Sequence, residues 1–244
     1  MYSPPAPGNV FVPCRRICFI VAMIHDIDFP RSLSGLALDH YLARGWFRMG
    51  HTIFTTHLIY LEEQFFPVYW LRIRLHDLHW GKRQRLIQRM NSSFEVRCTP
   101  LLLTEEMDDL YERYRQSVDF ATSPSLIDYL FNGRLHQVFD TRMIEVRDEG
   151  KLIAAGIFDK GARSIAGIIN FFDPDYAKFS LGKYLMLLKA EWAKEHGHFF
   201  YYPGYLAIGF NKFDYKLWLQ RSATEYFDPR TQQWLPVMTD RTGV

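Results

Sequence analysis

The stretch that decides the fold runs from Ile168 to Leu219 and reads IINFFDPDYAKFSLGKYLMLLKAEWAKEHGHFFYYPGYLAIGFNKFDYKLWL. Apolar residues recur in its middle at helical spacing, at Leu181, Tyr184, Leu185, Leu188 and Trp192. Ser180 is placed to cap this helix and Gly197 to end it. Phe199–Tyr202 follows as a strand, and a helical crossover returns it parallel to the strand before the helix. The stretch therefore predicts a strand–helix–strand unit with a parallel strand pair.

Three strands lead into this unit. Arg142–Arg147 and Lys151–Asp159 flank a hairpin turn at 148–150, and Ser164–Phe172 follows a second turn. Connections this short make neighbouring strands antiparallel. The order strand–strand–strand–helix–strand is similar to that of acetyltransferase-like (GNAT) cores. We therefore expect the α/β (α+β) class: a GNAT-like acyltransferase core with a mixed, mostly antiparallel sheet, plus an N-terminal appended subdomain.

The preceding region predicts one strand and three helices. Pro67–Leu75 alternates as a strand does. A helix after it combines a cationic face with an apolar stripe: Lys82, Arg83, Arg85 and Arg89 against Leu86, Ile87 and Met90. The next helix begins after Thr104 as N-cap and buries a stripe of Met107, Leu110, Tyr111, Tyr114 and Val118. A shorter helix, Ser125–Phe131, is expected to stop at Gly133.

Composition and charge indicate an ordinary globular chain of 244 residues. Apolar residues make up 48% and charged residues 23%, and the net charge of +2 does not argue for a nucleic-acid partner by itself. Residues 31–100 hold ten Lys/Arg against five Asp/Glu, whereas residues 101–150 hold five against eleven. This opposition either creates a basic face for a polyanion or is uneven solvated surface. We expect a disordered Pro-rich leader (1–30), an N-terminal subdomain (31–98) and a C-terminal transferase domain (99–244).

Cysteine usage and hydropathy exclude several classes. Cys14, Cys18 and Cys98 form neither a disulfide framework nor a pattern of zinc ligands. The longest apolar run, Ile17–Ile24, has eight residues, far short of the roughly 20 that span a bilayer. His25-Asp26 follows it where a signal peptide would have small residues. We expect a cytoplasmic protein, without a zinc or iron–sulfur cluster, that starts at Met1 or at Met23.

The deciding stretch resembles the C-terminal signature of the arginyl- and leucyl-tRNA–protein transferases. That signature is an aromatic strand, F-x-D-P, A-K-x-S-L-G-x-Y, a helix, Y-Y-x-G-Y and then Y-K. The matching residues are Asp173, Pro174, Ala177, Lys178, Ser180, Leu181, Gly182, Tyr184, Tyr201, Tyr202, Gly204, Tyr205, Tyr215 and Lys216. So many identities in the right order and spacing make the likeness specific at this end of the chain.

The likeness extends more loosely upstream. Leu42–Phe54, with Arg48 and His51, is similar to the N-terminal stretch of the family, and Trp80–Arg89 to a basic stretch of it. Where the family carries a cysteine cluster, no cysteine lies between His51 and Arg72, so any role of those thiolates is absent. The family element K-M-x-Y-K is matched in part at 212–216, by KFDYK.

The resemblance implies transfer of an amino acid from aminoacyl-tRNA, as co-substrate, to the N-terminal α-amine of an acceptor protein or peptide, with no cofactor and no membrane. It implies catalytic roles for Asp173, Ser180, Gly182 and Tyr184. It implies substrate or tRNA contacts at Lys178, Tyr201, Tyr202, Tyr205, Lys212, Tyr215, Lys216, Arg48, His51, Arg83, Arg85 and Arg89. The ester of the tRNA is already activated, so direct attack by the amine needs no enzyme nucleophile.

Each of these roles has a purely structural alternative. Asp173 either orients an amine or forms an Asp-Pro turn. Ser180 and Gly182 either present backbone N–H groups to an anion or make a plain helix start. Exposed tyrosines could stack on a terminal adenine, but one of Tyr201 and Tyr202 is expected in the core. Any single lysine is most often solvated surface, and His51 and His57 are ordinary polar residues without ligand partners.

Two other functions stay open from sequence. One is an acyl-CoA-dependent GNAT N-acyltransferase, although the loop before the helix offers only Gly182 in place of a Gly-rich pyrophosphate cradle. The other is a catalytically inactive homologue that binds tRNA or peptide, because the missing cysteines leave tRNA use open. The fold cannot choose among these. The transferred amino acid, the acceptor and the oligomeric state are not readable from the sequence.

Overall fold

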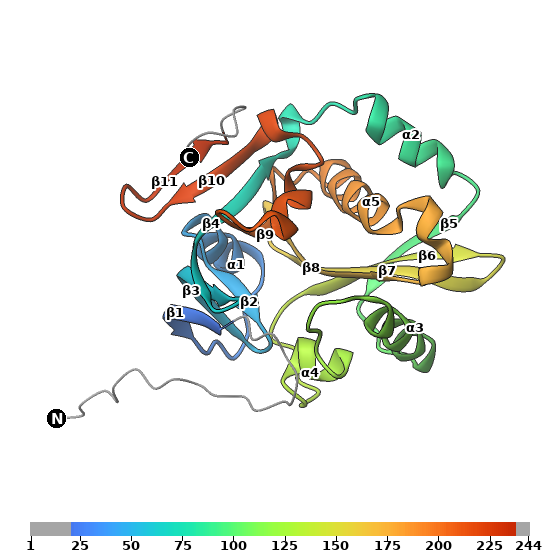
Figure 1. Ribbon diagram of the computed structural model, residues 1–244, viewed down its shortest axis with the longest axis horizontal. Helices are drawn as coiled ribbons and strands as arrows, with labels where there is room; N and C mark the ends of the chain where they lie inside the picture. Colours follow the sequence, from blue (N-terminus) through green and yellow to red (C-terminus); the bar gives the residue numbers. More distant parts are fainter. Residues whose placement is uncertain (1–20, 238–244) are drawn as a thin grey trace.

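Residues 21–237 are described by a computed structural model, in which one mixed sheet crosses the whole molecule (Figure 1). The strands of the main path lie in the order β1-β3-β4-β9-β8-β7-β6-β5. The strands are β1 (Val21–Asp28), β2 (Phe47–Met49), β3 (Thr52–Leu61), β4 (Gln64–Arg74), β5 (Glu95–Pro100), β6 (Thr141–Asp148), β7 (Lys151–Lys160), β8 (Ser164–Phe172), β9 (Phe200–Ala207), β10 (Thr224–Asp228) and β11 (Gln233–Pro236). The helices are α1 (Gly35–Ala43), α2 (Lys82–Met90), α3 (Glu105–Ser117), α4 (Leu126–Phe131) and α5 (Leu181–Glu195).

Helices cover both faces of the sheet half formed by β5 to β8 (Figure 1). One face carries α5, with α2 outside it, and the other carries α3 and α4. Alternation along β7 and β8 supplies both cores, because successive strand residues point to opposite faces. Phe158 of β7 packs with Leu185 of α5 in one core, whereas Phe171 of β8 packs with Met107 of α3 and Leu130 of α4 in the other.

The predicted core architecture is confirmed. β6, β7 and β8 are successive antiparallel strands, and β8 pairs with β9 in parallel across the α5 crossover. Thr104 caps α3 through a bond that its side chain accepts from the Met107 N–H, and the short helix α4 ends at a left-handed Asn132 just before Gly133. The mixed, mostly antiparallel sheet is therefore the one that the GNAT-like order predicts.

The N-terminal half corrects two expectations. Residues 21–28 are not leader but strand β1, which pairs antiparallel with β3, and residues 1–20 lie outside the described part. A boundary at 98/99 would cut strand β5 (Glu95–Pro100), which pairs with β6 along its whole length. The N-terminal segment also joins the same sheet, because β4 pairs with β9 from Val68 to Arg74. The two expected subdomains thus share one continuous sheet, and their separation stays a proposal.

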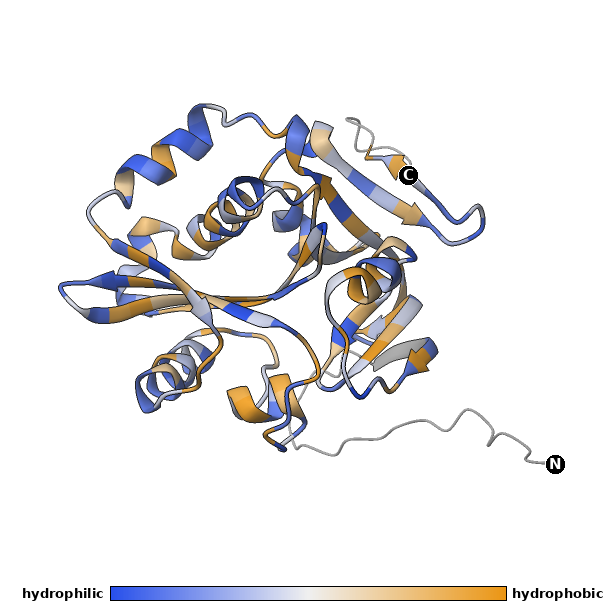
Figure 2. Ribbon diagram, turned by 180° about the vertical axis from the view of Figure 1, so that it is seen from behind, coloured by the Kyte–Doolittle hydropathy of each residue, from blue (hydrophilic) through white to orange (hydrophobic). Residues whose placement is uncertain are grey.

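The apolar stripe expected on α2 is also wrong. Only Ile87 is buried, whereas Leu86 and Met90 are 49% and 38% exposed. The helix is held instead by polar contacts: Gln84 donates to the Trp218 and Leu219 carbonyls at 3.1 and 2.8 Å. Figure 2 shows the resulting hydrophilic character along much of α2. Of the helices in the described part of the chain, none combines the length and the apolar character needed to cross a membrane.

Candidate active site

The strongest candidate site lies where β8 and β9 separate. The two strands pair only from Ser164 to Ala166 against Phe200 to Tyr202, whereas the other edge of β9 pairs with β4 from Phe200 to Ala207. The next residues of β8, 167–170, are half-buried rather than buried. Tyr201 packs against the β8 backbone at Gly167, where a Cβ would lie 2.6 Å from its hydroxyl oxygen. The separation therefore opens the sheet between two strands whose facing backbone edges are unpaired.

Side chains bind the backbone along this opening. The Tyr129 hydroxyl donates to the Ile168 carbonyl at 3.1 Å. On the facing strand, Lys216 Nζ donates to the Tyr205 carbonyl at 2.7 Å. Side chains thus satisfy carbonyl oxygens that would pair with a neighbouring strand in a continuous sheet, and these hydrogen bonds stabilise the opening.

Five tyrosines from four elements gather around the opening: Tyr114 of α3, Tyr129 of α4, Tyr201 and Tyr205 of β9, and Tyr215 of the 3₁₀ segment η3 (Asn211–Leu217). Burial raises the pKa of all five hydroxyls, that of Tyr114 to about 12. The neighbouring Tyr215 hydroxyl raises the pKa of the other four further. The hydroxyls therefore stay protonated at neutral pH, as uncharged donors and acceptors close to one another.

Lys216 supplies a cation to the same region. It is 8% exposed, and its Nζ lies 4.5 Å from the ring centroid of Phe213, 4.7 Å from that of Tyr205 and 5.6 Å from that of Tyr215. Burial lowers its pKa to about 7. Gly204 lies beside it at φ +101°, a conformation that favours glycine.

The start of α5 differs from the expected cap. Ser180 is the N-cap by position, but its left-handed backbone (φ 53°) leaves its side chain without a capping bond. The cause is the preceding 3₁₀ segment η2 (Pro174–Phe179), which the chain leaves through this residue. Gly182 lies against Phe172, with a hypothetical Cβ 3.2 Å from that ring. Tyr184 is buried in the core between α5 and the sheet, away from a role at the surface.

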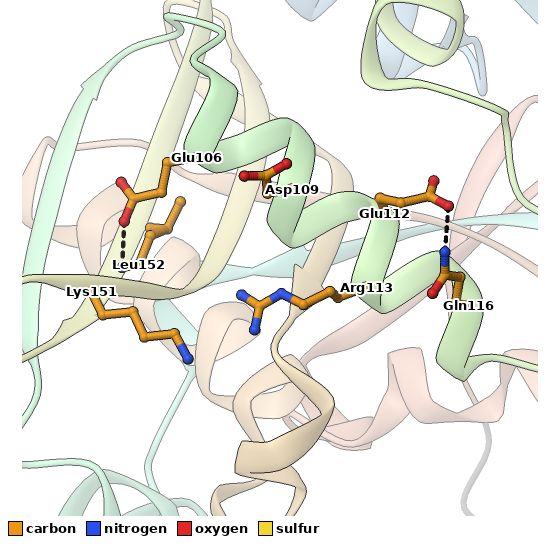
Figure 3. Close-up of a pocket in the computed structure, with 7 residues that line it drawn as sticks. All are labelled: Glu106, Asp109, Glu112, Arg113, Gln116, Lys151 and Leu152. Carbon is orange, nitrogen blue, oxygen red and sulfur yellow. Dashed lines mark hydrogen bonds between the residues drawn. The ribbon is translucent and has the colours of Figure 1, made fainter.

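Asp173 is a fully buried residue that pairs with two cations. Its carboxylate accepts from Arg113 of α3 at 2.8 Å and from Lys151 of β7 at 2.9 Å, and Figure 3 shows these two cations pointing toward each other. It also accepts from the Asp175 N–H at 3.2 Å. Burial alone would raise the pKa of Asp173, but the hydrogen bonds from Lys151 and Asp175 and the charge of Arg113 outweigh it and lower that pKa. The geometry favours the Asp-Pro turn over an orienter of the substrate amine.

Replacing Asp173 with asparagine is expected to destabilise the protein by about 1–3 kcal/mol, because two cations lose a buried partner but are themselves half-exposed. The folded pKa of Asp173 is lowered, so its stabilisation is present above the unfolded value of about 3.9 and is lost as pH falls below it. Urea unfolding at pH 7 and pH 3 measures both effects. A wild-type-minus-variant difference in unfolding free energy that does not shrink at pH 3 would contradict this account.

Three other expected contacts are wrong or lie elsewhere. Arg48 is not available to tRNA: its side chain is 3% exposed and pairs with the buried Asp159 at 2.8 Å. Tyr202 is 4% exposed on the opposite face of β9 from Tyr201, edge-on to Trp234, so both tyrosines belong to the core. His51 contacts the His136 carbonyl at 2.8 Å through Nε2, and its ring lies 6.0 Å from that of Phe131.

The remaining predicted contacts are surface cations. Arg83, Arg85 and Arg89 are exposed on α2, and Lys82, Arg85, Gln88 and Arg89 line a shallow depression there. Lys178 and Lys212 are exposed, each beside the ring of a neighbouring phenylalanine. Tyr205, Tyr215 and Lys216 lie together, and their contacts with a substrate stay a prediction. Sequence reasoning missed Tyr114, which was assigned to a helix core, and Tyr129, which no motif marks.

Comparison with known proteins defines the class. Residues 106–224 match the family described as arginine-tRNA-protein transferase, C terminus. The chain is 29% identical over 148 residues to an aspartate/glutamate leucyltransferase of Hahella chejuensis, covering 60% of this chain and 63% of that protein. It is 30% identical over 183 residues to that of Paramagnetospirillum magneticum, covering 74% of each. These are aminoacyltransferases, and the fold and the opening between β8 and β9 suit an acyltransferase.

The chain belongs to the aminoacyl-tRNA–protein transferase family. Solved structures that it resembles include FemX, with 11% identity, a TM-score of 0.42 and coverage of 75% of this chain and 63% of that one. A GCN5-related N-acetyltransferase from Kribbella flavida has 11% identity, a TM-score of 0.32 and coverage of 69% and 54%. The fold assignment rests on the strand order and the parallel β8–β9 pair rather than on these scores.

The described residues also include side chains of the types that bind metal ions. In the described range 21–237, no group of three or more His, Cys, Asp or Glu side chains is placed to hold a metal ion. Cys98 is half-buried in β5, and burial raises its pKa to about 11, which leaves the thiol protonated at neutral pH. Cys14 and Cys18 lie outside the described residues. The expectation that the protein uses neither a cofactor nor a cluster stays a prediction.

Proposed function

We propose that this protein transfers an aminoacyl group from charged tRNA to the N-terminal α-amine of an acceptor protein. The observation that carries the proposal is the opening between β8 and β9, lined by Tyr129, Tyr205, Tyr215 and Lys216, in a member of this family. The relatives are named aspartate/glutamate leucyltransferases. We extend that name to propose leucyl-tRNA as donor and an N-terminal Asp or Glu as acceptor residue.

The reaction depends more on positioning the amine against the ester than on a strong base or a nucleophile from the enzyme. The neutral acceptor amine attacks the ester carbonyl, a C–N bond forms, the C–O bond to the terminal ribose breaks, and the proton of the amine passes to the leaving ribose oxygen. Holding the two reactants together removes much of the entropic barrier, on the order of several kcal/mol. An α-amine with a pKa of about 8 is partly neutral at pH 7, so a strong base is not required.

The tyrosines suit the remaining requirement, a donor for the developing oxyanion. Their hydroxyls are uncharged at neutral pH and surround the opening from several elements. Donors fixed by the fold act on a transition state without reorganising, which is the main source of such stabilisation. We assign this role to Tyr205 or Tyr215, because the one hydroxyl proton of Tyr129 is donated to the Ile168 carbonyl.

The tRNA would be held by surface cations. The arginines of α2 are exposed, and α2 lies outside α5 on the same face of the sheet (Figure 1). Lys178 lies in η2 between β8 and α5, and Lys212 lies in η3 after β9. Exposed Lys and Arg contribute to affinity for a polyanion by releasing counterions from the phosphates. A cytoplasmic location belongs to the same proposal, because charged tRNA is the substrate.

The test is transfer of label from a pool of aminoacyl-tRNAs, charged with radioactive amino acids, to peptides that differ in their first residue. The proposal expects label on the α-amine of some peptides, and none after the tRNA has been deacylated. Incubation of the same peptides with labelled acetyl-CoA tests the alternative function, acyl-CoA-dependent N-acyl transfer. Acetyl transfer without aminoacyl transfer, from protein shown to be folded, would replace this proposal with an N-acyltransferase.

A further inference from the structure

Lys216 is a buried cation without a counter-charge. It is 92% buried, and within residues 21–237 it forms no ion pair with any carboxylate. Its one hydrogen bond goes to the Tyr205 carbonyl, which leaves two N–H groups of an ammonium to be satisfied. A buried charge of this kind is costly unless it is paired, and binding an anion would complete it.

The position of Lys216 limits which anion can reach it. Tyr205, Phe213 and Tyr215 enclose the ammonium on three sides, and Gly204 lies beneath it. Tyr215 is 52% exposed, so this side of the enclosure is open to solvent. A walled site with one cation suits a small carboxylate on a narrow chain better than a phosphate of a folded nucleic-acid backbone, for which Arg clusters and exposed surfaces are the usual partners.

We propose that Lys216 is the specificity-determining residue of the acceptor site and binds the side-chain carboxylate of an acidic N-terminal residue. The proposal rests on the proposed aminoacyl transfer, since it places the acceptor residue at the opening between β8 and β9. The carboxylate takes the two free N–H positions of the ammonium, while the α-amine of the same residue points toward the tyrosine hydroxyls. Residues with neutral side chains leave the cation unpaired and bind less well.

The titratable groups that face Lys216 favour this role. Tyr205 on β9 and Tyr215 on η3 both have a raised pKa and stay neutral, so neither supplies the missing negative charge. Since burial lowers the pKa of Lys216 to about 7, an incoming carboxylate should raise it and draw a proton from solvent. A carboxylate ligand would therefore bind with proton uptake at pH 8.

The kinetic test compares peptides that begin with Asp, Asn, Glu, Gln or Ala in the transfer reaction. Wild-type protein is expected to favour Asp over Asn by about tenfold or more in kcat/KM, the range of one charge-assisted hydrogen bond. Lys216→Met, which keeps the length and packing of the side chain, should lower the Asp-to-Asn ratio of kcat/KM to about one. Lys216→Arg should keep the preference for Asp.

Lys189→Met is the matched control. Lys189 is also buried, with its pKa lowered to about 7 by burial, and it also donates to carbonyl oxygens, those of Ile157 and Ile169. Its removal should reduce stability without changing the Asp-to-Asn ratio. A Lys216→Met variant that keeps the wild-type preference, or that loses Asp and Asn transfer equally, overturns the proposal, because the side chain would then serve the fold or the chemistry and not acceptor choice.

A binding measurement separates this proposal from the proposed reaction. Calorimetric titration of the protein, without tRNA, with an Asp-initiated peptide at pH 8 in two buffers of different ionisation enthalpy gives the number of protons taken up. We expect uptake approaching one proton for wild type with the Asp peptide, and none attributable to the site for Lys216→Met or for the Asn peptide. Proton uptake without any aminoacyl transfer would contradict the proposed reaction but support the carboxylate-binding site at Lys216. Equal binding of the Asp and Asn peptides by wild type would contradict the proposed carboxylate-binding site at Lys216.

Discussion

Replacement of Arg48 by methionine should lower the free energy of unfolding by about 3–5 kcal/mol, because it leaves Asp159 as a buried carboxyl group without its cation. Arg48 also donates to the Thr141 hydroxyl at 3.0 Å and to the Gly50 carbonyl at 2.8 Å. These bonds join the β2–β3 turn to β6 and β7, so the loss is not confined to one contact. Urea denaturation followed by circular dichroism measures it.

The loss of stability in Arg48→Met should also depend on pH. Burial raises the pKa of Asp159, and the charge and hydrogen bonds of Arg48 oppose that rise. Without Arg48 the folded pKa rises further above the unfolded value of about 3.9, so the variant should regain stability as pH falls toward 5. Asp159→Asn combined with Arg48→Met should be less damaging than the sum of the two single changes. A loss below about 1 kcal/mol for Arg48→Met would contradict the buried-pair account.

Replacement of Arg83, Arg85 and Arg89 by serine should weaken tRNA binding by about tenfold or more near 0.1 M salt, with little effect on stability. These side chains are exposed, and α2 is fastened by Ile87 and Gln84 instead. Each lost phosphate contact should reduce the slope of log K against log salt by about 0.7–0.9. Fluorescence anisotropy with labelled tRNA over a series of KCl concentrations gives both values.

The control for this variant is Arg97→Ser with Arg115→Ser. These arginines lie on β5 and α3, and each is paired with a carboxylate, Glu95 or Glu112, at 2.6 Å. Their loss should leave the salt slope unchanged. If the α2 triple variant also keeps the wild-type slope, the cationic face of α2 is a solvated surface and the tRNA lies elsewhere.

The core unit was predictable because its signals are local. The helical spacing after Leu181, the turn at 148–150 and the crossover rule together predict β6, β7, β8, α5 and β9 in the correct arrangement. Strand β1 was not predictable, because its apolar run stands beside a Pro-rich start and its partner β3 lies in a stretch without clear periodicity. Long-range pairing of this kind leaves no mark in a short window.

The site was predictable only in part, and for similar reasons. Tyr205, Tyr215 and Lys216 belong to a recognisable motif, and the structure brings them together. Arg48 matched a motif too, but its partner Asp159 lies 111 residues away, so its burial could not be read from either segment. The left-handed turn at Ser180 depends on η2 before it, and Tyr129 enters the site only through the packing of α4 beside β8.

The most direct test of the central claim is mass spectrometry of an Asp-initiated peptide incubated with the protein and purified leucyl-tRNA. The account predicts a gain equal to one leucyl residue, located on the α-amine by fragmentation, and no gain for the same peptide with an acetylated N-terminus. An unchanged Asp peptide, from protein shown to be folded, would contradict the claim, as would addition at a lysine side chain instead of the N-terminus.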